Sequence, residues 1–339
     1  MIAIILVNWN GKADTIECLE SLMRLDSDDF LAIVVDNGST DGSIAALNTW
    51  AATRERPMLS AGPWGELPRW RRRQPAVFEV VPDGVLAGLA PGSVAFVAAG
   101  ANLGFAGANN VGMALARGDP RVQHILLLNN DTIVKDDVLQ RLLTTAAEKP
   151  EAAIIGCCLK YYHAPHMVQG LAGFFNPWRA VGGHIGFGLT CDHLPDVADV
   201  EARMSYVMGA AMFLPVATLD EIGLMSEADF LYFEELNWAR RLGRGRQSVC
   251  LNATVFHKEG GSIGSSSLTR PSDTSLYYLN RNLLRFMWRW HPLLVPVAIL
   301  RVLREIIRYW PDQSALAILS TALVDGLFRK NSRYDRGGK

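Results

Sequence analysis

The sequence predicts an α/β fold: a mostly parallel sheet flanked by helices, with a helical region at the C-terminal end. Short apolar or β-branched runs alternate with helical patterns over the first 160 residues. The first run, Ile2–Asn8, is apolar almost throughout, as expected of a strand buried on both faces. Strands that alternate with helices favour parallel pairing through right-handed crossovers.

The expected elements follow in chain order. The strands are Ile2–Asn8, 31–36, Val94–Ala98, His124–Asn129 and 152–158. The helices, each with apolar residues at helical spacing, are 13–25, 43–53, 109–117 and 135–149. Residues 57–92 interrupt the alternation and are expected to form an inserted surface segment. In it, Arg69, Arg71, Arg72 and Arg73 are expected to form a solvated face, with binding of an anionic acceptor as the alternative. We place a sheet domain at 1–270 and a helical region at 271–339.

Composition and charge narrow the class of protein. The chain has 33 Lys and Arg against 34 Asp and Glu, so no net field attracts nucleic acid. Residues 285–339 carry ten basic and four acidic residues among several aromatic ones. This pattern is typical of contact with an anionic surface, such as the inner face of a cell membrane, but it equally fits packing on the main domain or in a homo-oligomer.

The location of the chain is expected to be cytoplasmic. Its five cysteines are odd in number and lack C-x-x-C spacing, which indicates free thiols in a reducing compartment rather than a disulfide framework or a zinc site. The N-terminal strand has no basic region before it and no cleavage site after it, so a signal peptide is not expected. No apolar run reaches the roughly 20 residues that span a bilayer.

Polar residues cluster where three of the expected strands end. They are Asn8 and Asn10, then Asp36 and Asn37, then Asn129, Asn130 and Asp131. Because α/β sheets bind ligands outside the C-terminal ends of their strands, we expect these side chains to form one site. Asp36 is suited to bind a nucleotide base or ribose, and Asp131 to bind a divalent cation that also takes diphosphate oxygens and water. Each residue taken alone fits a turn or a helix cap equally well.

A Gly-rich stretch that includes Asn102, Gly104 and Asn109 opens one of the expected helices. The N-terminus of a helix favours anions, so this stretch resembles a phosphate-binding loop. It lacks the P-loop lysine and does not match G-x-G-x-x-G, which makes it a weak signal by itself.

Three ionisable residues further along the chain are candidates for catalysis or metal binding. Glu234 and Glu235 follow an aromatic run at the start of a helix, where a glutamate is suited to deprotonate an acceptor hydroxyl. The alternative is that both acids only complement the helix dipole. His257 ends a strand-like run and is suited to complete a metal site or to contact a diphosphate, although a single histidine is commonly structural.

Taken in order, these segments resemble the family 2 glycosyltransferases of GT-A fold, particularly the rhamnosyltransferase-like branch that builds bacterial surface polysaccharides. The similarity runs from about residue 2 to 282, outside 57–92. It rests on 7–11, 35–42, 102–107 with Asn109 and Asn110, 128–131, 209–213, 233–235, His257 with Gly260 and Ser262, and Tyr277 and Tyr278 with Arg281 and Asn282. It implies a transfer that inverts anomeric configuration, from a nucleotide-sugar donor such as dTDP-rhamnose to a glycan or lipid-linked acceptor in the cell envelope. The implied cofactor is Mg²⁺ or Mn²⁺.

The resemblance also implies residue roles. Asp36 would contact the base or ribose, Asp131 the metal, and His257 the metal and diphosphate. Glu235 would be the base, with Glu234 beside it. The donor would further contact the asparagines and glycine named above. In the family's Asp-x-Asp motif only Asp131 remains acidic here, so we expect poor metal binding without donor.

Two other departures from the family concern the base. The acidic pair is Glu-Glu where Glu-Asp is commoner, and Asn237 stands where a second Asp is common. Two other functions stay open. A sugar-nucleotidyltransferase shares the sheet and the nucleotide chemistry, but Asn8 to Gly11 occupies the place of its basic Gly-rich loop. A non-catalytic nucleotide-sugar-binding protein is the other, although it would have no need to keep Asp36, Asp131, Glu235 and His257 together.

Overall fold

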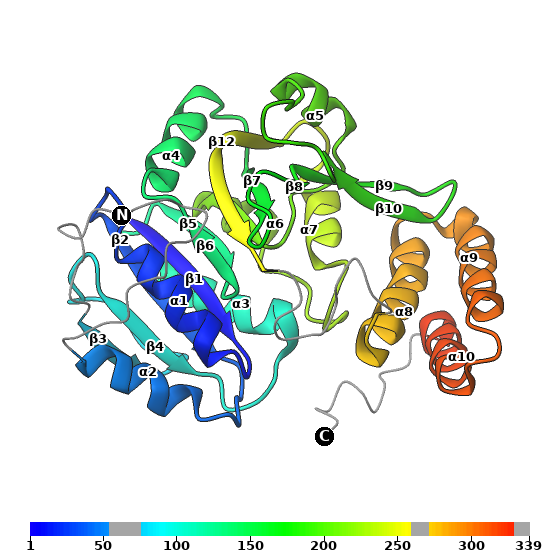
Figure 1. Ribbon diagram of the computed structural model, residues 1–339, viewed down its shortest axis with the longest axis horizontal. Coiled ribbons are helices and arrows are strands. Elements are labelled where there is room, and N and C mark those ends of the chain that lie inside the picture. Colours follow the sequence, from blue (N-terminus) through cyan, green and yellow to red (C-terminus); the bar gives the residue numbers. More distant parts are fainter. Residues whose placement is uncertain (54–75, 259–270, 329–339) are drawn as a thin grey trace.

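The computed structural model describes residues 1–53, 76–258 and 271–328 (Figure 1). Its strands are β1 (Ile2–Asn8), β2 (Phe30–Asp36), β3 (Val77–Val80), β4 (Val94–Ala98), β5 (His124–Asn129), β6 (Thr132–Val134), β7 (Ile154–Tyr161), β8 (Val168–Gly170), β9 (Ala172–Asn176), β10 (Val181–Ile185), β11 (Ala211–Pro215) and β12 (Gln247–His257). Its helices are α1 (Lys12–Leu22), α2 (Ser43–Ala52), α3 (Gly104–Arg117), α4 (Val138–Glu148), α5 (Val197–Arg203), α6 (Ala217–Ile222), α7 (Glu234–Leu242), α8 (Asp273–Trp290), α9 (Val295–Arg308) and α10 (Gln313–Phe328), with a 3₁₀ turn at Pro292–Leu294. The arginine run at 69–73, Gly260 and Ser262 lie outside the described residues.

The main sheet runs in the order β3-β4-β2-β1-β5-β11-β7-β12-β6, with β8 paired to β7. From β3 to β5 every pair is parallel, whereas β11 is antiparallel to both of its neighbours. Asn8 of β1 pairs with Asp36 of β2, and Val7 of β1 pairs with Asn129 of β5. The polar strand ends predicted from the sequence therefore meet at one edge of the sheet.

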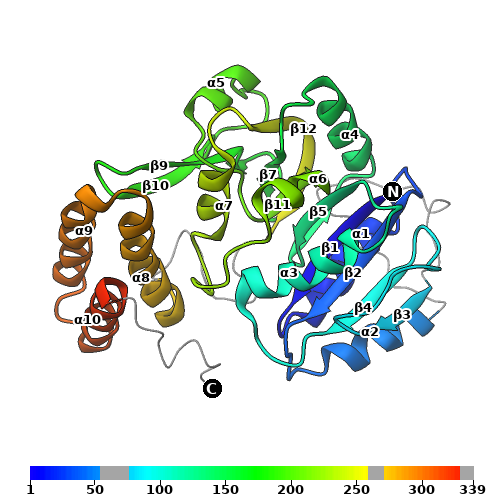
Figure 2. The ribbon, with the colours of Figure 1, turned by 180° about the vertical axis from the view of Figure 1, so that it is seen from behind.

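Alternate residues of β1 face two separate cores. Ile4 and Leu6 pack with Leu19 of α1, in a cluster that also takes in residues of α2 and α4. Ala3 and Ile5 face the opposite side, in a cluster completed by α3, α6 and α7. Figures 1 and 2 show these two sets of helices on opposite faces of the sheet. The layered α/β architecture predicted from the uninterrupted apolar strand is confirmed.

The structure adds features that the pattern of the sequence did not reveal. β3 lies within the expected insertion 57–92 and forms an edge strand parallel to β4. α3 begins at Gly104 rather than near residue 109, because the Gly-rich stretch itself forms the first turn of the helix. β11 runs antiparallel to β5 within the otherwise parallel part of the sheet. The sequence pattern could not predict this, because apolar periodicity does not depend on the direction of a strand.

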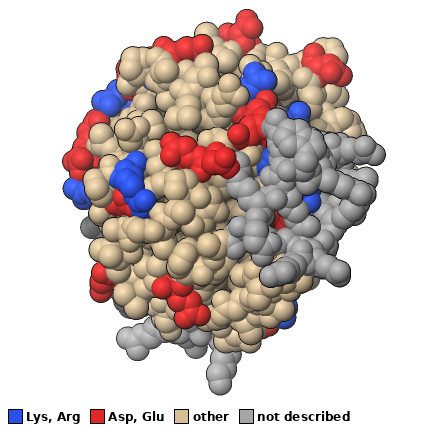
Figure 3. Space-filling model, turned by 90° about the vertical axis from the view of Figure 1, so that its left-hand side faces the viewer, with Lys and Arg blue, Asp and Glu red and all other residues tan. Residues whose placement is uncertain are grey.

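Helices α8, α9 and α10 stand beside the sheet, and the β9–β10 hairpin extends toward them (Figures 1 and 2). Ala180 in the turn of this hairpin packs in one apolar cluster with Leu236 of α7 and Leu284 of α8. Among the described helices, none has the length and apolarity needed to cross a membrane. Acidic and basic side chains are interspersed over the described residues of the face in Figure 3.

Candidate functional site

A pocket of about 1210 Å³ opens at the C-terminal edge of the parallel strands. Its wall combines two kinds of segment: the strand ends and loops of the sheet, and residues of α7, α8, α9 and the β9–β10 hairpin. Of the predicted site residues, the wall includes Asn37, Asn102, Gly104, Asn129, Asn130, Asp131, Glu234, Glu235 and His257. The structure thus gathers residues separated by as many as 220 positions into one cavity.

Asn8 and Asp36 lie under the pocket and bind each other. Nδ2 of Asn8 donates to Oδ1 of Asp36 at 2.8 Å and to Oγ of Ser39 at 3.0 Å, and the N–H of Ser39 donates to Oδ2 of Asp36. Thr15 of α1 donates to Oδ1 of Asn8 and accepts from Asn130. Asp36 is only 2% exposed. This network fixes the strand ends, and the proposed contact of Asp36 with a nucleotide stays a prediction.

Asn37 and Asn102 shape the Gly-rich turn before α3. Nδ2 of Asn37 donates to Oδ1 of Asn102 at 3.0 Å, and Oδ1 of Asn37 accepts from the N–H of Leu103 at 2.8 Å. The N–H of Gly104 donates to Oδ1 of Asn102. Asn109 is buried and donates to the carbonyl of Phe105 one turn back, and Asn10 accepts from the N–H of Thr40. The pocket wall does not include Asn8, Asn10, Asp36 or Asn109.

Asp131 and His257 form the candidate metal pair. Nε2 of His257 lies 3.1 Å from Oδ1 of Asp131 and 3.5 Å from Nδ2 of Asn129. On its other side the ring meets Gln169 of β8, with Nδ1 2.9 Å from Oε1. Gln169 and Asp131 thus present oxygen acceptors to the two ring nitrogens. A neutral ring with its proton on Nδ1 would turn the lone pair of Nε2 toward Asp131, which is the form that binds a metal. In that form, Nε2 of His257 and Oδ1 of Asp131 would share a cation.

The ligand set of this pair is small. No group of three or more His, Cys, Asp or Glu side chains with metal-binding spacing occurs within the described residues. Mg²⁺ is commonly held by one or two protein ligands together with substrate phosphates and water. Asp131 and His257 therefore fit a divalent cation that is shared with a diphosphate, and they do not form a complete cage of their own. Gln169 was not predicted as a site residue, since nothing in its local sequence indicates a contact with His257.

Lys258 anchors the strand that carries His257. Its Nζ donates to Asp14 at 2.6 Å and to Glu17, both on α1, and Glu17 also accepts from the hydroxyl of Tyr162. Burial disfavours the charge, but the two carboxylates outweigh it and raise the pKa of Lys258 to about 12. Its backbone N–H donates to the carbonyl of Asp131. This ion-pair cluster ties the end of β12 to α1.

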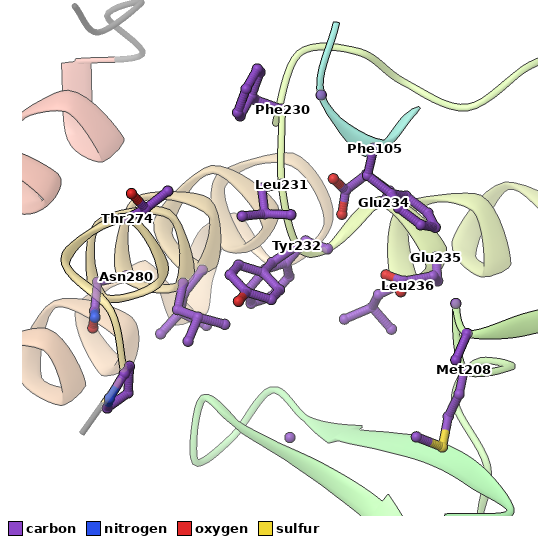
Figure 4. Close-up of a pocket in the computed structure, with 18 of the residues that line it drawn as sticks. Phe105, Met208, Phe230, Leu231, Tyr232, Glu234, Glu235, Leu236, Thr274 and Asn280 are labelled. Atoms are coloured by element: carbon purple, nitrogen blue, oxygen red, sulfur yellow. The ribbon is translucent and has the colours of Figure 1, made fainter. Parts of the chain in front are cut away.

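The two glutamates at the start of α7 have different surroundings (Figure 4). Glu234 is 1% exposed, and its Oε1 makes no hydrogen bond within the described structure. Burial raises the pKa of Glu234 well above its ordinary value of 4.5, and the charge of Glu235 adds to the rise. Burial also raises the pKa of Glu235, although its own N–H and that of Gly209 donate to its carboxylate and oppose the rise.

The absence of a side chain at Gly209 determines the position of the Glu235 carboxylate. A Cβ atom at residue 209 would lie 2.1 Å from Oε1 of Glu235, so only glycine lets the carboxylate approach this backbone. In Figure 4, Glu235 on α7 lies across from Met208, on the segment that leads into β11. The carboxylate of Glu235 therefore lies against the backbone of Gly209, which opposes the rise in its pKa. Such a fixed position suits a general base.

The far end of the pocket is lined by the C-terminal helices. α8 contributes Thr274 and Asn280, which Figure 4 shows across from the loop that precedes α7. α9 contributes Arg301, Glu305 and Arg308. Arg301 and Arg308 both pair with Glu305, which is 8% exposed. The pocket is thus long enough to extend from the sheet edge to the helical region.

Comparison with known proteins agrees with the architecture. Residues 85–173 match the family model described as glycosyl transferase family 2. Sequence comparison with curated proteins gives no match. Among solved structures, the fold is similar to GalNAc-T7 with UDP, GalNAc and Mn²⁺, at 12% identity and a TM-score of 0.59, over 95% of this chain and 54% of that chain.

Two more solved structures are similar at lower scores. The mannosyltransferase PcManGT from Pyrobaculum calidifontis, in complex with GDP-Man and Mn²⁺, has 14% identity and a TM-score of 0.48, over 98% of this chain and 76% of that chain. S. aureus TarS has 13% identity and a TM-score of 0.47, over 84% of this chain and 39% of that chain. The chain thus spans about half, or less, of the length of GalNAc-T7 and TarS.

Proposed function

We propose that this chain, which carries a family 2 glycosyltransferase match on a GT-A fold, transfers a sugar from a nucleotide-sugar donor to a hydroxyl of a glycan or lipid-linked acceptor, with inversion. One observation carries the proposal: the backbone-held carboxylate of Glu235 lies in the same pocket as Asp131 and His257. A base and a diphosphate-side metal pair in one cavity are the groups that glycosyl transfer needs.

The donor would lie along the sheet edge. Asn37, Asn102 and Gly104 line the pocket there, and Asn129 and Asn130 lead to Asp131. The N-terminus of α3 favours the diphosphate charge. When bound at Asp131 and His257, Mg²⁺ or Mn²⁺ would supply positive charge beside the departing diphosphate. Rhamnose carried on dTDP is the first donor to test, because of the resemblance of the motifs.

Glu235 would act on the acceptor. It takes the proton of the acceptor hydroxyl while that oxygen forms a bond to the anomeric carbon. The bond from the anomeric carbon to the phosphate oxygen breaks, and the nucleoside diphosphate leaves with the electron pair. Attack opposite the leaving group inverts the anomeric configuration. Burial raises the pKa of Glu234 and so favours its neutral form, which would place less negative charge beside the reacting hydroxyl.

The direct test is release of nucleoside diphosphate from a panel of nucleotide-sugars, with and without Mg²⁺ or Mn²⁺. We expect turnover with one donor class, and loss of that turnover in Asp131→Ala. Asp83→Ala serves as the control, because Asp83 is exposed and is not part of the pocket wall. Release of pyrophosphate would instead support the nucleotidyltransferase, and tight donor binding without turnover would support the binding protein.

We also propose that α9 rests on an anionic membrane surface, near the lipid-linked acceptor. Leu300, Leu303 and Ile307 share one face of the helix and are 67%, 39% and 73% exposed. Arg304 is exposed beside them, and Trp310, 71% exposed, follows the helix. Within the described part of α9 the acidic residue is Glu305, which is buried and paired. An apolar face flanked by arginine complements anionic headgroups and disfavours water.

Flotation with vesicles separates this surface from a dimer interface. We expect binding to vesicles that contain phosphatidylglycerol, and loss of most binding in Leu300→Asp/Ile307→Asp. Equal binding of wild type and this variant would contradict the membrane contact. A concentration-dependent dimer that the same variant dissociates, without vesicle binding, would assign the face to a second copy of the chain.

A further inference from the structure

The loop before α7 holds an unusual backbone. Phe230, Tyr232 and Phe233 have φ values of 65°, 68° and 73°. This left-handed region is costly for residues with a side chain, and for bulky aromatic ones in particular. Such conformations persist only where the surroundings determine them, and they concentrate at functional sites. Here the loop leads directly into Glu234 and Glu235.

Asn282 of α8 holds this loop through its side chain. Nδ2 donates to the carbonyls of Asp229 at 2.8 Å, Leu231 at 2.7 Å and Tyr232 at 3.3 Å. The neighbouring Arg281 donates from Nη2 to the carbonyl of Asp229 at 2.8 Å. Asn282 and Arg281 are both fully buried. A single side-chain amide therefore satisfies carbonyls on both sides of the left-handed turn at Phe230.

The orientation of the Asn282 amide is fixed by chemistry. Its Oδ1 accepts from Nε of Arg281 at 2.8 Å. A guanidinium can only donate, so the oxygen must face Arg281 and the NH₂ group must face the loop. Arg281 is itself held over the rings of Tyr277 and Tyr278, at 5.4 Å and 4.7 Å from their centroids. Reversing the amide would turn three donor contacts into carbonyl–carbonyl repulsion.

The other side of the loop rests on the Gly-rich turn of α3. The N–H of Phe105 donates to the carbonyl of Phe230 at 3.0 Å. A Cβ at Gly104 would lie 2.4 Å from that same oxygen. The ring of Phe230 stacks on Tyr278 of α8, with centroids 5.1 Å apart. The loop is thus enclosed between a segment of the candidate donor site and α8, as Figure 4 shows for Phe105 and Phe230.

We propose that Asn282 is a positioning residue for the catalytic base. Its amide holds the backbone of residues 229–232 in a conformation that starts α7 at the point from which Glu235 reaches Gly209 and the acceptor. The role rests on the glycosyl transfer proposed above. Asn282 does not contact the reacting atoms. It acts through the direction that the loop gives to α7, and misplacing a catalytic group by about 1 Å can reduce rate about 100-fold.

Asn282→Asp is the sharpest variant. It keeps the size of the side chain and the acceptor for Arg281, but it has no donor for the loop carbonyls. We expect kcat to fall about 100-fold, with KM for the donor and the Kd for the nucleoside diphosphate changed less than about threefold. Thr218→Val is the matched control, since the buried Thr218 also donates from its side chain to a backbone carbonyl, that of Ala153, and is not part of the pocket wall. We expect it to lower Tm without changing kcat.

A second measurement reports the base without turnover. In protein labelled with ¹³C-glutamate, the titration of Glu235 is identified by its absence in Glu235→Gln. We expect Asn282→Asp to move this titration toward the ordinary value, because a relaxed loop admits water. Unchanged kcat and an unchanged titration would overturn the positioning role. A moved titration in a chain that transfers no sugar would leave that role standing and refute the proposed function.

Discussion

The two ends of the pocket are built in different ways. At the sheet edge, Asn8 and Asp36 are neighbours in the strand register and bind each other directly. At the start of α7, the position of Glu235 depends on Gly209, just before β11, and on side chains of α8 more than 40 residues away. The first end is assembled by the sheet itself. The second depends on contacts between distant segments, so single substitutions there should have larger effects on catalysis.

The largest expected effect is that of Glu235→Gln. Loss of a positioned base should reduce kcat about 10²–10⁴-fold, with Tm unchanged or higher since a buried acid is removed. In wild type, burial raises the pKa of Glu235, so kcat should fall as pH drops through that raised pKa, above the ordinary value of 4.5. A pH–rate profile checks this, and a larger loss in Glu234→Gln would transfer the role to Glu234.

Gly209→Ala should have the next largest effect. Its Cβ would lie 2.1 Å from Oε1 of Glu235, so the carboxylate must move. We expect kcat to fall about 100-fold, with little change in nucleoside diphosphate binding by calorimetry. Gly118→Ala is the control, because Gly118 is not part of the pocket wall and its new Cβ would lie 3.4 Å or more from its nearest neighbours. Activity retained in Gly209→Ala would show that Glu235 need not approach this backbone.

At the sheet edge we expect a smaller effect from Gln169→Leu. The substitution removes the acceptor that orients His257, and loss of such an outer contact typically weakens metal binding about 10–100-fold. Mn²⁺ titration in the presence of nucleoside diphosphate, followed by electron paramagnetic resonance, measures this. Gln169→Glu should restore much of the affinity because it retains an acceptor. Equal Mn²⁺ affinity in all three proteins would exclude an orienting role for Gln169.

The smallest effect concerns stability in Glu234→Gln. The pKa of Glu234 is raised in the folded state, so the stability due to its neutral form is present below about pH 4.5 and is lost as pH rises toward the raised value. Wild type should therefore lose stability relative to the variant as pH rises above about 4.5. We expect a relative change in Tm of about 2–4 °C, and parallel Tm curves would contradict a buried neutral Glu234.

How far the sequence predicts this molecule depends on the range of the contacts. The apolar run of β1 and the polar residues that end β1, β2 and β5 are local patterns, and from them the layered fold and the sheet edge of the pocket follow. The direction of β11, the edge strand β3 and the contact of Gln169 with His257 depend on pairing across the chain. No periodicity encodes such pairings, so these features became visible only in three dimensions.

The roles of individual residues were harder to predict than their location. Asn37 and Asn102 line the pocket as expected, whereas Asp36 lies beneath its wall and binds Asn8 and Ser39. A polar residue at a strand end can contact ligand or support its neighbours, and the sequence alone does not separate these uses. Asn282 shows the converse case, since a buried asparagine in an amphipathic helix gives no sign of the distant loop that it binds.

The dependence of the loop on α8 also bears on how the protein is made. Asn282 follows Asp229 by 53 residues in the chain. During synthesis, β1, β2, β4 and β5 can pair and bury their apolar faces well before α8 emerges from the ribosome. The sheet edge would then exist before the turn that places Glu235. A nascent chain would thus form the sheet edge of the pocket first and would place Glu235 only after α8 docks.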